Sequence, residues 1–171
     1  MKKIVVKFII LIITIFILWW SYLHIYGNFH KVDNDVFRSG QLYSFNMPYY
    51  IKSNHIKTII NLKKKIDTYE QAFVKENNIT YIHFVLSDKK NISLKEMKTL
   101  SNLIKSAPKP VLIHCFAGAD RTSLAVGIYL YDKNNSNYKK AFDFIPYGHF
   151  PWFGSPTKAM DESFKKYLKK D

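Results

Sequence analysis

A strand, a short loop and a helix follow one another around the only cysteine of the chain. Residues 111–113 are Val, Leu and Ile, an apolar run typical of a short buried strand, and His114 and Cys115 follow directly. A loop of mostly small residues then leads to Arg121, and after Thr122 apolar side chains recur at helical spacing. A lone cysteine is therefore expected at the end of a strand, with an arginine six residues later at the start of a helix.

This arrangement suits the binding of a phosphate group. A tight loop at a helix start turns several backbone N–H groups toward an anion. Gly118 permits backbone angles that other residues resist, and Arg121 can donate two parallel hydrogen bonds to a phosphoryl group. The same positive environment favours the thiolate form of a cysteine, which makes Cys115 a candidate nucleophile toward phosphorus.

Five positions of this stretch match a known signature. They are His114, Cys115, Gly118, Arg121 and Thr122, in the spacing His-Cys-x-x-Gly-x-x-Arg-Ser/Thr. On these residues the chain resembles the protein tyrosine phosphatase superfamily, and most closely its small, dual-specificity-like bacterial branch. The alternative is a structural cysteine before an ordinary helix start, which five matches in a strand–loop–helix context disfavour.

The resemblance implies a role for each residue of the signature, without a metal or other cofactor. Cys115 would attack phosphorus and form a phosphocysteine, and Arg121 would hold the phosphoryl oxygens. Thr122 would donate a hydrogen bond to the departing sulfur, and His114 would orient the loop. The loop that binds phosphate would consist of Phe116, Ala117, Gly118, Ala119, Asp120 and Arg121.

The oxygen that leaves the substrate needs a proton, because even a tyrosine hydroxyl has a pKa of about 10. Relatives use an aspartate on a loop after the preceding strand, and Asp88 occupies that place, 27 residues before Cys115. We therefore predict Asp88 as the general acid. A solvated loop carboxylate is the alternative reading of Asp88, and Asp120 is the second candidate for the acid. His149, in an aromatic loop, is a weaker candidate for the border of the pocket.

A second segment adds to the likeness. The run Arg38-Ser-Gly-Gln41 resembles a segment that packs beside the phosphate loop in the small phosphatases. Arg38 is therefore a candidate for support of the substrate pocket. The alternative is a surface arginine followed by a turn at Gly40.

Strands and helices alternate along the rest of the chain. The expected strands cover residues 57–62, 79–85 and 111–114, and the expected helices cover 48–53, 67–77, 93–106, 137–145 and 155 onward. This order predicts an α/β fold with a mostly parallel central sheet flanked by helices. Such a sheet binds ligands beyond the carboxyl ends of its strands, where Cys115 would lie.

The N-terminal part is a separate unit. Residues 8–26 are almost wholly apolar, and this length is close to the roughly 20 residues that cross a bilayer as a helix. We predict a cytoplasmic N-terminus and transmembrane anchor at 1–26, a polar tether at 27–35 and a phosphatase domain at 36–171. A cleaved signal peptide is the alternative, but Trp19 and Trp20 stand where the small residues of a cleavage site would lie.

Charge predicts the orientation and the class of partner. Lysines precede the apolar run and two aspartates follow it, so the positive-inside rule predicts a single-pass protein with its domain on the exported, periplasmic side. The formal net charge of +13 favours an anionic partner, here a phosphorylated protein or a lipid or glycan phosphate. The lysines are scattered and match no nucleic-acid motif, so no nucleic-acid partner is expected.

Departures from the residue patterns of related families narrow the range of expected substrates. Phosphoinositide 3-phosphatases carry lysines at the positions of Phe116 and Ala119, and inositol-pyrophosphate phosphatases carry basic residues at Ala119 and Asp120. Ser123 also replaces the usual glycine after the signature. The leading prediction is thus a tyrosine or dual-specificity phosphatase, and the first alternative is the same chemistry on a lipid or envelope glycan phosphate. An inactive phosphate-binding module is the alternative of another class.

Overall fold

The strand that leads into Cys115 lies at the centre of the sheet. In the computed structural model, which describes residues 2–169, β5 (Val111–His114) lies between two parallel neighbours within a five-stranded sheet of order β1-β2-β5-β3-β4. The other strands are β1 (His30–Lys31), β2 (Val36–Ser39), β3 (Thr58–Asn61) and β4 (Thr80–His83). Only the pairing of β1 with β2 is antiparallel among these described strands, so the predicted mostly parallel sheet is confirmed.

The central strands are apolar on both faces because helices cover both faces. Every residue of β2, β3 and β5 is buried. Side chains alternate between two cores, so that Ile60 and Ile113 face one core while Ile59 and Leu112 face the other. Three buried strands of this kind hold the carboxyl end of β5, and hence Cys115, in a fixed place.

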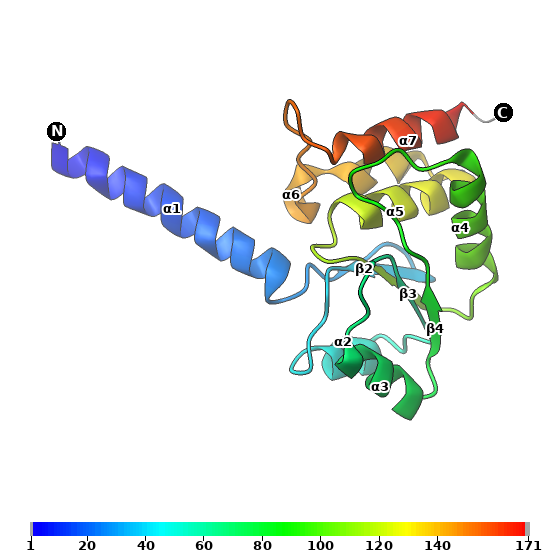
Figure 1. Ribbon diagram of the computed structural model, residues 1–171. Coiled ribbons are helices and arrows are strands. Elements are labelled where there is room, and N and C mark those ends of the chain that lie inside the picture. The colour runs from blue at the N-terminus through cyan, green and yellow to red at the C-terminus, as the bar shows by residue number, and fades with distance from the viewer. Residues whose placement is uncertain (1, 170–171) are drawn as a thin grey trace.

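Helices pack on the two sides of the sheet, as Figure 1 shows. On one side lie α4 (Leu94–Ser106), α5 (Asp120–Asp132), η1 (Ser136–Phe142), α6 (Phe144–Tyr147) and α7 (Lys158–Leu168). On the other side lie α2 (Met47–Ser53) and α3 (Thr68–Glu76). The predicted caps are present: Asp67 accepts two backbone hydrogen bonds at α3, and Ser93 with Glu96 forms a capping box at α4.

The segment after α5 differs from the sequence prediction. Instead of one helix over 137–145, the chain forms a 3₁₀ helix that ends at Phe142 and a short α-helix whose backbone is non-helical at Ile145. Pro146 explains the break, because it restricts the preceding residue and has no N–H to donate. The last helix starts at Lys158, three residues after the predicted Ser155.

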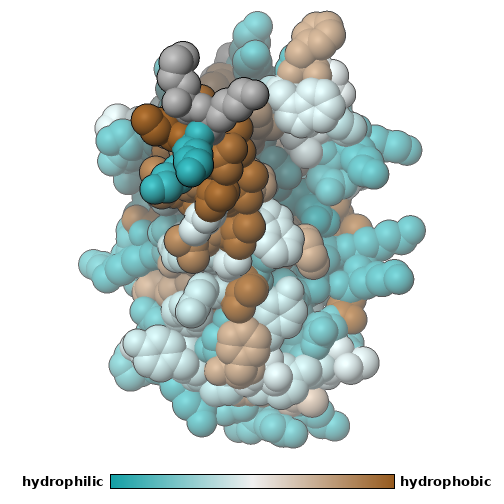
Figure 2. All heavy atoms as spheres, turned by 90° about the vertical axis from the view of Figure 1, so that its left-hand side faces the viewer, coloured by the Kyte–Doolittle hydropathy of each residue, from teal (hydrophilic) through white to brown (hydrophobic). Residues whose placement is uncertain are grey.

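Helix α1 (Lys2–His24) projects away from the domain (Figures 1 and 2). Its span Lys3–His24 is long and apolar enough to cross a membrane, and its large apolar side chains from Ile4 to Leu18 are exposed. An apolar helix without protein around it is not the core helix of a soluble domain. Near its end, Leu23 is buried and Trp19 contacts Phe144.

Residues 27–35, the predicted tether, lie against the domain. Asn28 is fully buried and its amide donates to the backbone carbonyls of Ala117 and Tyr147 (2.9 and 3.0 Å). Two residues later, β1 extends the sheet. The division at residues 1–26, 27–35 and 36–171 stays a prediction; residue 1 and residues 170–171 lie outside the described part of the chain.

Candidate active site

Cys115 lies in the loop that joins the central strand to the central helix. The strand β5 ends at His114, and α5 begins at Asp120, so five residues make the turn. Cys115 is buried, with 3% of its surface exposed, and Gly118 takes a positive φ of +72°. The predicted strand–loop–helix arrangement is therefore present, at the carboxyl edge of the sheet.

The Arg-Ser-Gly-Gln segment packs directly beside this loop. The backbone N–H of Gln41 donates to the carbonyl of Phe116 (2.8 Å). A Cβ atom added to Gly118 would lie 2.5 Å from the backbone nitrogen of Gly40. A Cβ atom added to Gly40 would lie 2.8 Å from the carbonyl oxygen of Phe116. Both glycines are thus required by close backbone contact, which fixes the shape of the phosphate loop.

Arg38 is fully buried and holds this loop from behind. Its guanidinium donates to the carbonyls of Gly118 and Ala141 (both 2.8 Å) and to the hydroxyl of Ser123 (2.9 Å). The Tyr147 ring lies over the guanidinium, 3.8 Å from its centroid. Burial lowers the pKa of Arg38 to about 10, which still leaves it protonated at neutral pH. The surface-arginine alternative is therefore wrong, and Arg38 is a positioning residue for the loop.

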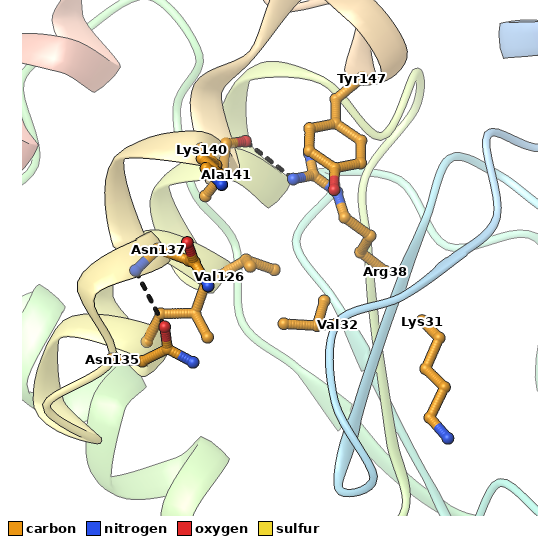
Figure 3. Close-up of a pocket in the computed structure, with 10 residues that line it drawn as sticks. Lys31, Val32, Arg38, Val126, Asn135, Asn137, Lys140, Ala141 and Tyr147 are labelled. Carbon is orange, nitrogen blue, oxygen red and sulfur yellow. Dashed lines mark hydrogen bonds between the residues drawn. The ribbon is translucent and has the colours of Figure 1, made fainter.

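Figure 3 shows that a separate cavity borders Arg38. Its volume is about 220 Å³, and Arg38 with the Tyr147 ring above it forms one end. Neither Cys115 nor Arg121 lines this cavity. The cavity is therefore not the opening through which a phosphate would reach the cysteine.

His114 is held by a buried carboxylate that the sequence did not suggest. Its Nε2 lies 2.6 Å from Oε1 of Glu70, with both side chains 2% exposed, and its Nδ1 lies 3.3 Å from the carbonyl oxygen of Cys115. Burial alone would raise the pKa of Glu70, but the charge and hydrogen bond of His114, with Lys63 and Asn61, hold it below its usual value. Both ring nitrogens of His114 thus face oxygen acceptors, which orients the imidazole next to Cys115.

The side chains of Arg121 and Asp88 lie close to each other, at the carboxyl edge of the sheet. The guanidinium of Arg121 donates to the carbonyl of Leu62 (3.4 Å) and lies 3.9 Å from the Oδ2 atom of Asp88. The Arg121 side chain is 13% exposed and that of Asp88 is 41% exposed. Leu62 follows β3 and Asp88 follows β4, so two neighbouring strand ends deliver them to the same edge.

Lys63 is a further charged group that sequence analysis missed. It follows Leu62, and its ammonium group donates to the side-chain oxygen of Gln41. Burial lowers the pKa of Lys63, the negative charges of Glu70 and Cys115 oppose this, and Arg121 adds to the lowering. These interactions locate Lys63 beside the phosphate loop. Its place directly after a buried parallel strand was the available signal.

Thr122 is completely buried, and its hydroxyl makes no hydrogen bond within residues 2–169. A buried hydroxyl without a partner is uncommon and calls for an explanation. The predicted hydrogen bond to the sulfur of a departing thiolate would supply one. No group of three His, Cys, Asp or Glu side chains in the described residues is arranged to hold a metal ion.

Asp120 turns toward His149 rather than standing free. Nδ1 of His149 lies 2.7 Å from Oδ1 of Asp120, and its Nε2 lies 3.1 Å from Oδ2 of Asp161. Burial alone would lower the pKa of His149, but the hydrogen bonds and charges of the two aspartates raise it to about 9. His149 is itself 3% exposed, so it braces the start of α5 and does not border an open pocket.

The ion pairs of His149 with Asp120 and Asp161 predict that the stability of the protein depends on pH. Because the folded pKa of His149 (about 9) exceeds its usual 6.5, its contribution is fully present below pH 6.5 and is lost as pH rises through 9. We expect the free energy of unfolding to fall by on the order of 2 kcal/mol over that window. Thermal unfolding of the full chain in detergent at both pH limits measures it. A His149→Gln variant should lack this part of the fall, and an equal fall in both proteins would contradict the assignment.

Comparison with known proteins agrees with this geometry. The sequence model of the tyrosine phosphatase family matches residues 25–130. Inositol diphosphatase DSP4 of Arabidopsis thaliana is 34% identical over 108 residues, which cover 58% of this chain and 53% of the plant protein. The chain thus spans about half the length of that relative.

Solved structures share the fold. The core catalytic domain of the PP-IP phosphatase SIW14 from S. cerevisiae superposes with a TM-score of 0.67 at 22% identity, over 84% of this chain and 90% of that one. TpbA of P. aeruginosa superposes with a TM-score of 0.65 at 16% identity, over 82% and 84% of the two chains. These likenesses confirm the predicted α/β fold of the cysteine phosphatases.

Proposed function

Because the chain belongs to the tyrosine phosphatase family, we propose that this phosphatase cleaves phosphate monoesters through a phosphocysteine intermediate. The observation that carries the proposal is that Asp88 lies 3.9 Å from Arg121, at the edge of the sheet where β5 ends and Cys115 follows. A nucleophile, a phosphate clamp and a carboxylic acid are the three groups that this chemistry needs.

In the first step, the Cys115 sulfur attacks phosphorus as the bond to the leaving oxygen breaks. Arg121 and the backbone N–H groups of the loop hold the other phosphoryl oxygens, where negative charge is spread. Protonated Asp88 gives its proton to the leaving oxygen. The products of this step are an alcohol or phenol and a phosphocysteine.

In the second step, water attacks the phosphorus of the phosphocysteine. Asp88, now a carboxylate, takes a proton from this water, and the sulfur departs as a thiolate. Thr122 donates its hydrogen bond to that sulfur, which supports the departure of the thiolate. Inorganic phosphate then leaves, and both Cys115 and Asp88 return to their starting forms.

The phosphate loop favours a substrate that carries a single phosphate group. Phe116, Ala119 and Asp120 add no positive side chain, so Arg121 and Lys63 supply the cationic groups of the site. Relatives cover several chemistries: one is named an inositol diphosphatase, one a PP-IP phosphatase, and TpbA has been solved in complex with pTyr. A phosphorylated protein side chain and a lipid or glycan phosphate both carry a single phosphate group, and the same catalytic steps apply to each.

The proposed location is a membrane surface. The exposed apolar helix α1 leads into a domain that starts within a few residues of the helix end, which fits a membrane anchor. Lysines before the span favour a domain on the exported, periplasmic side. Alkaline phosphatase fused after Asp171 should then be active in bacterial cells, and an inactive but stable fusion would contradict this orientation.

The test of the proposed function is turnover of an aryl phosphate by the full chain in detergent micelles. We expect phosphate release at mildly acidic pH, with a phosphoryl group trapped on the peptide that contains Cys115 after rapid acid quenching. Mass spectrometry of the quenched protein detects that peptide. No release between pH 5 and pH 8 would favour an inactive phosphate-binding module instead.

A further inference from the structure

An apolar groove lies between the end of α1 and the phosphate loop. Three segments that are far apart in sequence line it: the end of α1, the loop after Gln41 and the phosphate loop itself. Its volume is about 450 Å³, and the lining residues are Trp20, His24, Ile25, Tyr43, Phe45 and Phe116. This volume falls within the range of about 300–1,000 Å³ that is usual for small-molecule sites.

The groove adjoins the candidate nucleophile. Phe116 directly follows Cys115, and its ring, 54% exposed, meets the His24 ring edge-on with centroids 5.8 Å apart. Phe45 is 66% exposed and stacks on Tyr43 at 5.8 Å. A phosphate held at Cys115 therefore has exposed apolar side chains next to it, in place of the lysines that would bind further phosphates.

The same groove is continuous with the apolar surface of α1. Trp20 and His24 belong to the last turns of the helix, and their rings stack 4.5 Å apart. Trp side chains near the end of a membrane span prefer the membrane–water boundary. One wall of the groove is therefore expected to lie at the depth of the lipid headgroups.

A second aromatic cluster extends the same apolar face. Trp19 contacts Phe144 (4.9 Å), which contacts Phe150 (5.1 Å). Phe144 and Phe150 are exposed, and so are three further large apolar residues of the same segment, Ile145, Trp152 and Phe153. Figure 2 looks onto the side of the domain from which α1 projects. Exposed apolar side chains gathered around a membrane span indicate that this side lies on the bilayer.

We propose that the groove binds the hydrocarbon part of a membrane-resident phosphate monoester, so that the substrate of this enzyme is a lipid phosphate. The inference rests on the proposed phosphatase function. The phosphate lies in the loop against Arg121, and the first carbon atoms of the lipid pass over Phe116 and Phe45. A water-soluble phosphopeptide gains nothing from an apolar groove that opens toward the bilayer, which is why the lipid is the occupant that this geometry favours.

The test uses the full chain in phosphatidylcholine vesicles. Phosphatidic acid in the vesicles is compared with glycerol 3-phosphate, which carries the same phosphate monoester without hydrocarbon, and with an aryl phosphate and a phosphotyrosine peptide. We expect kcat/KM for phosphatidic acid to exceed that for glycerol 3-phosphate by at least about 10-fold. The reason is that the exposed apolar side chains of the groove leave water when the hydrocarbon of the lipid covers them. A peptide preferred over the lipid would overturn the inference.

A matched pair of variants tests the groove itself. Phe45→Gln should lower kcat/KM for phosphatidic acid about 10-fold more than it lowers kcat/KM for glycerol 3-phosphate, which has no hydrocarbon chain to contact Phe45. Tyr49→Gln changes an aromatic residue of similar exposure (68%) that does not line the groove, and it should leave both unchanged. Equal losses on both substrates with Phe45→Gln would refute the groove as a hydrocarbon site. Turnover of aryl phosphate without lipid turnover would refute the inference and keep the proposed function, whereas no turnover of any substrate would refute both.

Discussion

Replacing Cys115 by Ser is expected to lower kcat on an aryl phosphate by at least about 10⁴-fold, because a serine hydroxyl is not ionised and is a poor nucleophile toward phosphorus. The change replaces one atom of a side chain that is 3% exposed, at the end of a fully buried strand. The fold should therefore persist while the chemistry stops. Initial rates of phosphate release from the full chain in micelles measure the loss.

Two controls separate lost chemistry from lost structure. The thermal midpoint of Cys115→Ser should lie within a few degrees of the wild type, since the volume of the buried side chain hardly changes. The variant should also still bind inorganic phosphate, because Arg121 and the loop backbone are intact. A variant that keeps more than about one hundredth of the wild-type rate would show that the nucleophile lies elsewhere.

The part of the site that sequence predicted consists of local features. The strand before Cys115, the tight turn at Gly118 and the helix after it are each specified by neighbouring residues, through an apolar run, a positive φ and helical spacing. The caps at Asp67 and Ser93 are equally local, and both are present. A chain segment that determines its own structure in this way can be identified before the fold is known.

The part that sequence missed depends on contacts between distant segments. Glu70 resembles a solvated residue in the first turn of a helix, yet the fold places it 2.6 Å from His114. Asn28 resembles a linker residue, yet it is buried and its amide donates to the carbonyls of Ala117 and Tyr147. His149 and Asp120, 29 residues apart, meet only because the loop after α6 returns to the start of α5. Such pairs are set by topology, and a single sequence carries no periodic signal for them.

The general acid is the site assignment that a single substitution tests most directly. Asp88 lies 3.9 Å from Arg121, whereas the carboxylate of Asp120 is already 2.7 Å from His149. A carboxylate that is already paired with a buried histidine is poorly placed to protonate a leaving group. The two candidate aspartates thus lie in different surroundings. Substitution of Asp88 should change catalysis, whereas substitution of Asp120 should change stability.

Asp88→Asn is expected to lower kcat by about 100-fold or more for substrates with a basic leaving group, since an amide cannot donate the proton that the leaving oxygen needs. For leaving groups of low pKa, which depart without protonation, the fall should be less than about tenfold. Rates across a series of substituted phenyl phosphates therefore become steeply dependent on leaving-group pKa in the variant.

Asp120→Asn is the matched control. It weakens the ion pair with His149, so it should lower the thermal midpoint and leave the dependence of the rate on leaving-group pKa as in the wild type. If Asp88→Asn turns over phosphotyrosine at the wild-type rate, Asp88 is not the general acid. The same conclusion follows if the rates of Asp120→Asn depend steeply on leaving-group pKa.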